Sequence, residues 1–400
     1  RHAIASDCTQ LSRAMSDPSD NELGNEEEDE TKANNLADPE IVTKYRLAGD
    51  IATKTLAKLC EMIVPGKSPL EISEAGDAMI NEACAAVYSK SKLEKGVAFP
   101  TCVSVNNCVG HFCPLKDEDG PPLAPGDIVK LDLGVHIDAY ATQVAFTLVV
   151  PNADGSAPTM ANLKAMDVIK AAHDASELMQ RMFKVGAKGS EMSAMVEAVA
   201  TSYGVSAVQG VLSHQSKKHV IDGNRCVNNK PTVEHKVDEV TFEANDVFSF
   251  DVVLSTGEGK SNEQSARTTI FKRAVDQTYK LKMKTSRAFF SEVNKRFSTF
   301  PFTLRALADS RAAKMGVVEC VNHELMESYP VLYEKPGEVV AHFKFTAMLL
   351  PTSIVRATEG PALQAFVTSE KKVEDEALAT LLATEIVKKK KKEKKPKAAE

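Results

Sequence analysis

The sequence predicts a mixed α/β (α+β) fold built from two similar halves. Helical periodicity followed by strand alternation occurs twice, over residues 38 to 150 and again over 159 to 254. Similar letters join the two helices of each half, VPGKS at 64 to 68 and VGAKGS at 185 to 190. A composition of 43% hydrophobic and 26% charged residues gives ample core for one large domain or two. Together these observations predict a duplicated α+β unit.

The first half begins after an acidic segment. Residues 1–37 are polar, with the run EEEDE at 26 to 30, and cannot bury enough apolar surface to offset the entropy of ordering. We therefore expect this tail to be disordered. Asp38 and Pro39 then provide an N-cap and a first-turn proline for a helix that ends before Pro65 and Gly66, and a second helix follows.

The segment 128 to 150, IVKLDLGVHIDAYATQVAFTLVV, reads as two alternating strands joined by a tight turn. If the turn centres on Ile137 and Asp138, Asp132 and Gln143 become cross-strand neighbours on one face of the sheet. The second half predicts helices over 159 to 184 and 190 to 203, the latter ended by Gly204.

Two later strands alternate charged and aromatic residues. Over 246 to 254, Asp251 lies on the face opposite the phenylalanines, and over 338 to 350 Lys344 does the same. Five polar groups are therefore expected at or beside strands. They are Asp132, Gln143, His214, Asp251 and Lys344.

The charges are sorted into separate regions. Residues 1–40 carry a net −8, residues 272–314 a net +8, and residues 388–400 a net +6. A helix predicted over 281 to 297 puts Phe289, Phe290, Val293 and Phe297 on one face, which we interpret as a core anchor rather than a base-stacking platform. A second short helix is predicted from Leu304 to Met315.

The opposite face of that helix and the C-terminal tail predict an RNA-binding surface. The expected RNA contacts are Lys280, Lys282, Lys284, Arg287, Lys295, Arg296, Lys388, Lys389, Lys390, Lys391 and Lys392. The lysine tail is alternatively a solvated or nuclear-import tract. A helix over 374 to 387 contains an LxxLL pattern, Leu378, Leu381 and Leu382, which fits either a partner-binding helix or simple packing.

Other classes of function are disfavoured. No apolar run approaches the roughly 18 residues of a membrane helix, so no membrane insertion is expected. The eight cysteines show no paired spacing, which favours reduced thiols. A zinc cluster of Cys102, Cys108, His111 and Cys113 is considered, but irregular spacing on alternating strands disfavours it.

Five segments resemble the signature segments of type 2 methionine aminopeptidases, members of the M24-like peptidases. They are AFPTCVSVNNCVGHFCP, KLDLGVHIDAY, SHQSKKH, FDVVLSTGEG and AHFKFTAMLLP. The resemblance implies the pita-bread fold, with two pseudo-symmetric halves around a di-metal site. It implies an aminopeptidase-like domain over 38–367 with a helical insert at about 278–335, followed by a helix and a lysine-rich tail over 368–400.

The resemblance also implies which residues matter. The family's five metal ligands, Asp, Asp, His, Glu and Glu, fall on Asp132, Gln143, His214, Asp251 and Lys344, so only the first and third are kept. His111 resembles the substrate-side histidine. An amide cannot bridge ions as a carboxylate can, and an ammonium donates rather than ligates. We therefore expect a relic metal site without catalytic residues or metal cofactor, in which Lys344 pairs with Asp132 and Asp251.

These departures, with LKMKTSRAFFSEV and LYEKPGEVVAHFKFT, resemble the proliferation-associated, ErbB-receptor-binding branch. That resemblance implies a pseudo-enzyme that binds structured RNA, especially ribosomal RNA. It also implies roles in ribosome biogenesis, translation and growth regulation, in the nucleolus, nucleus and cytoplasm. The alternatives are an active metal-dependent methionine aminopeptidase, and a protein-interaction adaptor or transcriptional co-repressor that uses the C-terminal helix.

Overall fold

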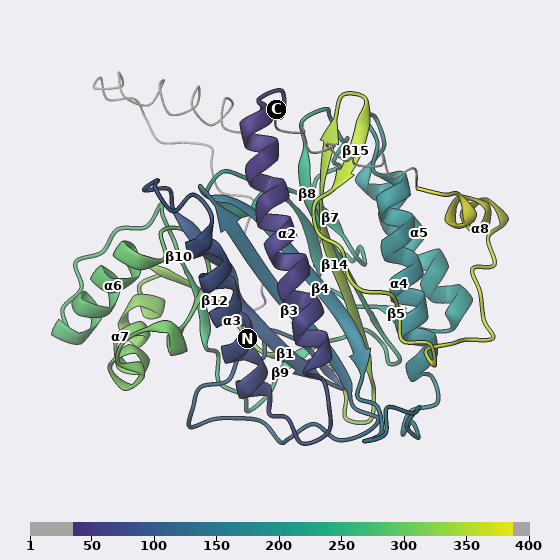
Figure 1. The fold of residues 1–400 in the computed structure, drawn as a ribbon, viewed down its shortest axis with the longest axis horizontal. Coiled ribbons are helices and arrows are strands. Elements are labelled where there is room, and N and C mark those ends of the chain that lie inside the picture. The colour runs from purple at the N-terminus through teal and green to yellow at the C-terminus, as the bar shows by residue number, and fades with distance from the viewer. Residues whose placement is uncertain (1–34, 387–400) are drawn as a thin grey trace, which may run out of the picture.

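A nine-stranded antiparallel sheet forms the centre of the molecule, which is described here over residues 35–386 of a computed structural model (Figure 1). Seven strands follow the order β1-β3-β4-β14-β8-β6-β7, while β15 pairs with β14 and β5 with β8. Their bounds are β1 Lys95–Val105, β3 Ile128–Ile137, β4 Tyr140–Val149, β5 Ser206–Ala207, β6 Leu212–Lys217, β7 Val220–Asn228, β8 Val247–Ser255, β14 Val340–Leu350 and β15 Ser353–Arg356.

Four long helices cover one face of this sheet (Figure 1). They are α2 Pro39–Glu61, α3 Pro69–Ala86, α4 Ala165–Met182 and α5 Gly189–Tyr203. Helix α2 packs on β3 and β4, and α4 packs on β14 and β8, while α3 and α5 lie on β1 and β7. The apolar faces of these helices and strands form the main core, whose burial supplies the dominant stabilisation.

Helix boundaries follow the capping residues. Asp38 accepts a hydrogen bond from the Glu40 amide at the start of α2, and Ser68 forms a capping box with Glu71 at the start of α3. Gly204 ends α5 in the left-handed conformation. The ends at Asp38 and Gly204 agree with the sequence prediction, whereas α4 begins at Ala165 instead of residue 159.

The predicted duplication is visible in the backbone. The amide of Gly66, between α2 and α3, donates to Leu123 O at 2.8 Å, and the amide of Gly186, between α4 and α5, donates to Phe242 O at 2.9 Å. Both glycines have positive φ, +87° and +84°, which a residue with a Cβ rarely adopts. The two halves therefore repeat the same helix, helix, strand connection.

The register of the β3–β4 hairpin differs from the prediction. Asp138 and Ala139 form the turn with φ of +53° and +61°, as a two-residue type I′ turn requires. Asp132 therefore lies opposite Ala145, and the prediction that it faces Gln143 was wrong. The sequence offered no sign of this turn position, because alanine seldom adopts positive φ.

The insert has its own small core at one side of the sheet (Figure 1). Strand β10 (Ile270–Arg273) pairs with β11 (Phe302–Thr303) and β12 (Met326–Tyr329), and α6 (Lys284–Arg296) packs against α7 (Ser310–Asn322). The helix predicted over 304 to 315 was wrong in place. A 3₁₀ turn, η1, occupies Leu304–Ala306, and α7 begins only where Asp309 caps it. A third sheet joins β2 Cys108–Gly110, β13 Leu332–Tyr333 and β9 Asn262–Glu263.

Both expected tail boundaries need adjustment. Leu36 is buried beside Ile41 and Tyr45, so packed structure begins before residue 38. Val373 is buried in the main core, so the chain does not leave the domain at 367. Helix α8 is shorter than predicted and spans Glu376–Ala383. Among the described residues, no helix is long and apolar enough to span a membrane.

Candidate functional site

Five neighbouring strands bring the predicted polar residues to one face at the centre of the sheet. Cross-strand pairing puts Asp132 opposite Ala145, Ala145 opposite Lys344 and Lys344 opposite Asp251. Residues that face each other in an antiparallel sheet point to the same side, so these four side chains form a row. The other predicted members share that side by alternation, Gln143 on β4 and His214 on β6.

Lys344 is the centre of this row. Its Nζ lies 2.8 Å from Asp251 Oδ2 and 3.2 Å from Asp132 Oδ2, and all three side chains are about nine-tenths buried. Asp132 lies two strands from Lys344, roughly 10 Å across the sheet. The small Ala145 on the strand between these two residues leaves room for the lysine to reach Asp132. The ammonium thus joins the carboxylates of both halves, which is the pairing expected from the sequence.

The electrostatics of the row follow from its burial. Burial disfavours the charge of Lys344, but the two carboxylates outweigh that cost and raise the pKa of its ammonium. Burial likewise opposes the charge of Asp251, yet Lys344 and His342 hold the pKa of this carboxyl well below its usual range. Both groups are therefore ionised at neutral pH.

His342 is a member of the site that the sequence reasoning missed. Its Nε2 lies 2.7 Å from Asp251 Oδ1, on the oxygen that Lys344 does not contact. Because His342 is two residues from Lys344 on one strand, alternation alone places both on the same face. That spacing was the available signal.

Two further histidines border the row. His214 Nδ1 donates to Gly223 O at 3.1 Å, and His111 Nδ1 donates to Pro330 O at 3.0 Å. Burial lowers the pKa of both imidazoles. Each ring is therefore neutral at physiological pH, with its tautomer set by a backbone carbonyl. His111 also contacts the ring of Phe99, over which the Lys344 ammonium lies.

Comparisons with known proteins show the family to which this chain belongs. The model of metallopeptidase family M24 matches residues 43–270. The protein named ErbB-3 binding protein 1 of Solanum tuberosum is 44% identical over 83% of this chain and 85% of its own length. The curved DNA-binding protein of Schizosaccharomyces pombe is 38% identical over 91% and 96%. A solved thermophilic Arx1 covers 87% of this chain and 99% of its own, with a TM-score of 0.79 and 30% identity.

The chain belongs to metallopeptidase family M24. Its similarity to ErbB-3 binding proteins puts it in the proliferation-associated, ErbB-receptor-binding branch. The predicted pita-bread fold is thereby confirmed.

The residues of this M24 site do not fit two divalent ions. Asp132, Asp251 and Lys344 sum to −1, so two such ions would leave +3 in a buried site. Two like charges about 4 Å apart repel by roughly 4 kcal/mol even at an effective dielectric of 20. The Lys344 ammonium already lies between the two carboxylates. Within residues 35–386, no group of three or more His, Cys, Asp or Glu side chains could hold a metal ion.

The four residues considered for a zinc site, Cys102, Cys108, His111 and Cys113, also form no metal site within residues 35–386. Cys108 turns its thiol to Gly110 O, whereas Cys102 and Cys113 lie together in a separate apolar cluster. The described part of this M24 chain therefore does not bring the four candidates into a metal site.

The insert carries the predicted basic surface. Six of the expected RNA contacts are exposed on or beside α6, namely Lys280, Lys282, Lys284, Arg287, Lys295 and Arg296. Phe289 and Val293 are buried on the opposite face, and Phe290 and Phe297 are partly buried against the same cluster, as a core anchor requires. Lys388 to Lys392 lie outside the described residues.

The three leucines of α8 are partly buried against the main core of the M24 domain. Leu378, Leu381 and Leu382 contact that core, and α8 packs on α4. The LxxLL pattern therefore has a packing role inside this chain.

Proposed function

We propose that this chain is a non-catalytic M24 protein that binds structured RNA, especially ribosomal RNA, and acts in ribosome biogenesis, translation and growth regulation. One observation carries the non-catalytic part. The Lys344 ammonium lies 2.8 and 3.2 Å from the two carboxylates that the family would use for metal. Hydrolysis in this family needs the Lewis acid and activated water that bound metal supplies, and this residue set disfavours such binding.

Metal binding and turnover test this part directly. Purified protein incubated with Mn²⁺, Co²⁺ or Fe²⁺ should retain well under one ion per chain and should not release methionine from Met-initiated peptides. Lys344→Glu alone should also stay inactive, because Gln143 still lacks a carboxylate. Two tightly bound metal ions per chain, or appreciable hydrolysis by that single variant, would contradict the proposal.

The basic surface of the insert supports the RNA-binding part. Among the described residues, Arg296 is the only one of the six exposed cations with a carboxylate within 4 Å, Glu292 at 2.6 Å. The buried Phe289 and Val293 hold α6 in place, so the four cations of this helix, Lys284, Arg287, Lys295 and Arg296, have a fixed support. A relative named for binding curved DNA, 38% identical, supports a nucleic-acid ligand for this surface.

Charge reversal on α6 tests the surface. Lys284→Glu/Arg287→Glu should weaken ribosomal RNA binding at least about tenfold and reduce the log-log salt slope by about 2, since each lost phosphate contact removes about one counterion. Lys54→Glu/Lys58→Glu is the matched control, because these exposed lysines lie one turn apart on α2 and the net charge change is the same. Equal loss in both variants would refute a local site.

A protein-partner role is the second candidate, supported by the name of the ErbB-3 binding relatives at 42 to 44% identity. Binding to such a partner should be insensitive to salt if it uses apolar contacts. The packed leucines of α8 argue against that helix as the free binding element. Function in the nucleolus, nucleus and cytoplasm belongs to the same proposal and is testable by imaging the tagged chain.

A further inference from the structure

Two cysteines meet beside a cavity on the insert side of the sheet. The amide of Val103 donates to Phe112 O at 2.8 Å, which sets β1 antiparallel to the segment after β2. Cys102 and Cys113 therefore lie opposite each other across this pairing, and the Cys102 thiol donates to Pro100 O at 3.4 Å. Both are about 1% exposed and belong to one apolar cluster.

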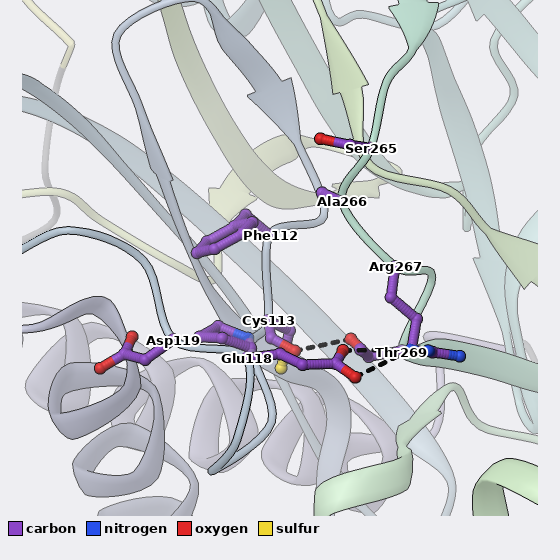
Figure 2. Close-up of a pocket in the computed structure, with 9 residues that line it drawn as sticks. Phe112, Cys113, Glu118, Asp119, Ser265, Ala266, Arg267 and Thr269 are labelled. Atoms are coloured by element: carbon purple, nitrogen blue, oxygen red, sulfur yellow. Dashed lines mark hydrogen bonds and ion pairs between the residues drawn. The ribbon is translucent and has the colours of Figure 1, made fainter.

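A cavity of about 270 Å³ borders Cys113 (Figure 2). Thr269 Oγ1 donates to Cys113 O at 2.6 Å, and Arg267 Nε donates to Glu118 Oε1 at 2.9 Å, so polar contacts fix the wall on both sides. The cavity is far larger than one water needs. Small polar molecules can therefore reach the residue that carries the Cys113 thiol.

A buried cation favours reaction at Cys113. The Arg305 guanidinium of η1 lies beside this segment, where it donates to Pro114 O at 2.8 Å and to Asp77 Oδ2 at 2.6 Å. The neighbouring Cys102 and the charge of Arg305 lower the pKa of Cys113, against burial and the charge of Asp77. A thiolate next to a neutral thiol is the arrangement of a nucleophile with its resolving partner.

We propose that Cys102 and Cys113 form a redox-reactive pair, which a hydroperoxide entering the cavity beside Cys113 oxidises to an intramolecular disulfide. The Cys113 thiolate attacks one peroxide oxygen, the O–O bond breaks, and Cys113 becomes a sulfenic acid while the other oxygen leaves as an alcohol or water. The Cys102 sulfur then attacks the Cys113 sulfur and displaces water. Two thiols are thereby oxidised and one peroxide is reduced.

The disulfide would change how the insert is held. Arg305 belongs to the insert, and it reaches across to Asp77 on α3 and to the Cys113–Pro114 segment. Oxidation removes the thiolate that neutralises part of its charge. We expect faster amide exchange at Leu304–Ala306 after oxidation, with exchange in α2 unchanged.

Peptide mapping tests the pair in the full chain without any substitution. After a brief treatment with hydrogen peroxide and alkylation, a Cys102–Cys113 linkage should form at least about tenfold faster than oxidation of Cys84 or Cys320, which are equally buried. Dithiothreitol should reverse it. No linked peptide at that dose, or equal oxidation of all buried cysteines, would overturn the proposal.

The variant Cys102→Ser separates the two steps. Because it keeps Cys113 and removes the resolving thiol, dimedone should trap a sulfenic acid on Cys113 in this variant and far less in the native chain. Cys84→Ser, a matched change of another buried thiol, should leave the Cys102–Cys113 linkage intact. Absence of dimedone labelling in Cys102→Ser would exclude Cys113 as the attacking group.

Discussion

Two ion pairs of nearly equal length have very different surroundings in this molecule. Lys344 and Asp251 approach to 2.8 Å at the centre of the sheet, with side chains 10% and 12% exposed. Arg296 and Glu292 approach to 2.6 Å on α6, with side chains 43% and 32% exposed. The comparison shows that burial, not distance, decides what each pair contributes, because water and salt screen only the exposed one.

The same comparison separates a structural cation from a binding cation. Lys344 is neutralised by carboxylates from both halves and cannot attract a ligand. Lys284 and Arg287 are exposed and have no carboxylate within 4 Å in the described part of the chain, so their field extends into solvent. Lysine and arginine thus stabilise the fold in one region and are proposed to bind a polyanion in the other.

The largest expected effect is the loss of the buried cation. Lys344→Met should lower the free energy of unfolding by about 3–5 kcal/mol, because it leaves two buried carboxylates without a counter-charge. Urea denaturation at pH 7 measures this change. Lys284→Met is the matched control and should stay within about 0.5 kcal/mol of the native chain, since Lys284 is exposed. A small effect of Lys344→Met would remove the contrast between the two regions.

The sequence predicted the buried site and the pairing of Lys344 with both carboxylates, but not the cross-strand register beneath them. Strand alternation places Asp251 and Lys344 on one face, and the family motif adds Asp132, but neither gives the register that puts Ala145 between them. That register depends on positive φ at Asp138 and Ala139, which the letters do not show. Cross-strand contacts are set by the turn, so one misplaced residue changes every partner.

The insert shows a similar limit. The apolar periodicity of Phe289 and Val293 predicted α6 and its buried face, because local spacing is enough for an amphipathic helix. It did not predict where α7 begins. The predicted helix began at Leu304, whereas the side chain of Asp309 caps the start of α7 at Ser310.

Lowering the pH is expected to change the free energy of unfolding by an intermediate amount. The pKa of Asp251 is depressed in the folded chain, so its stabilisation is present above the unfolded pKa of about 3.9 and is lost as pH falls toward the lower folded value. Below pH 4 the native chain should lose stability more steeply than Asp251→Asn, by at most about 1.4 kcal/mol per pH unit.

Urea unfolding of both proteins between pH 6 and pH 2 measures that difference in slope.

The raised pKa of Lys344 makes stability depend on pH in the opposite direction. Its stabilisation is complete below the unfolded pKa of about 10.4 and is lost only as pH rises through the folded value. If the free energy of unfolding fell equally steeply below pH 4 for the native chain and for Asp251→Asn, the Asp251 carboxylate would not be held ionised by Lys344.

The smallest expected effect on stability comes from the exposed pair. Glu292→Gln should change the free energy of unfolding by less than about 0.5 kcal/mol, because the pair is solvated and lies one turn apart on a helix.

The Glu292→Gln variant also frees Arg296 and raises the positive charge of α6. We therefore expect ribosomal RNA affinity to rise, by roughly two- to threefold at low salt, and the gain to shrink as salt increases. Titration of labelled RNA at two salt concentrations measures it, with Glu40→Gln on α2 as the control for charge alone. Higher affinity in both variants would point to net charge rather than to this surface. A destabilisation as large as that of Lys344→Met would instead show that burial does not set the energetic weight of the two pairs.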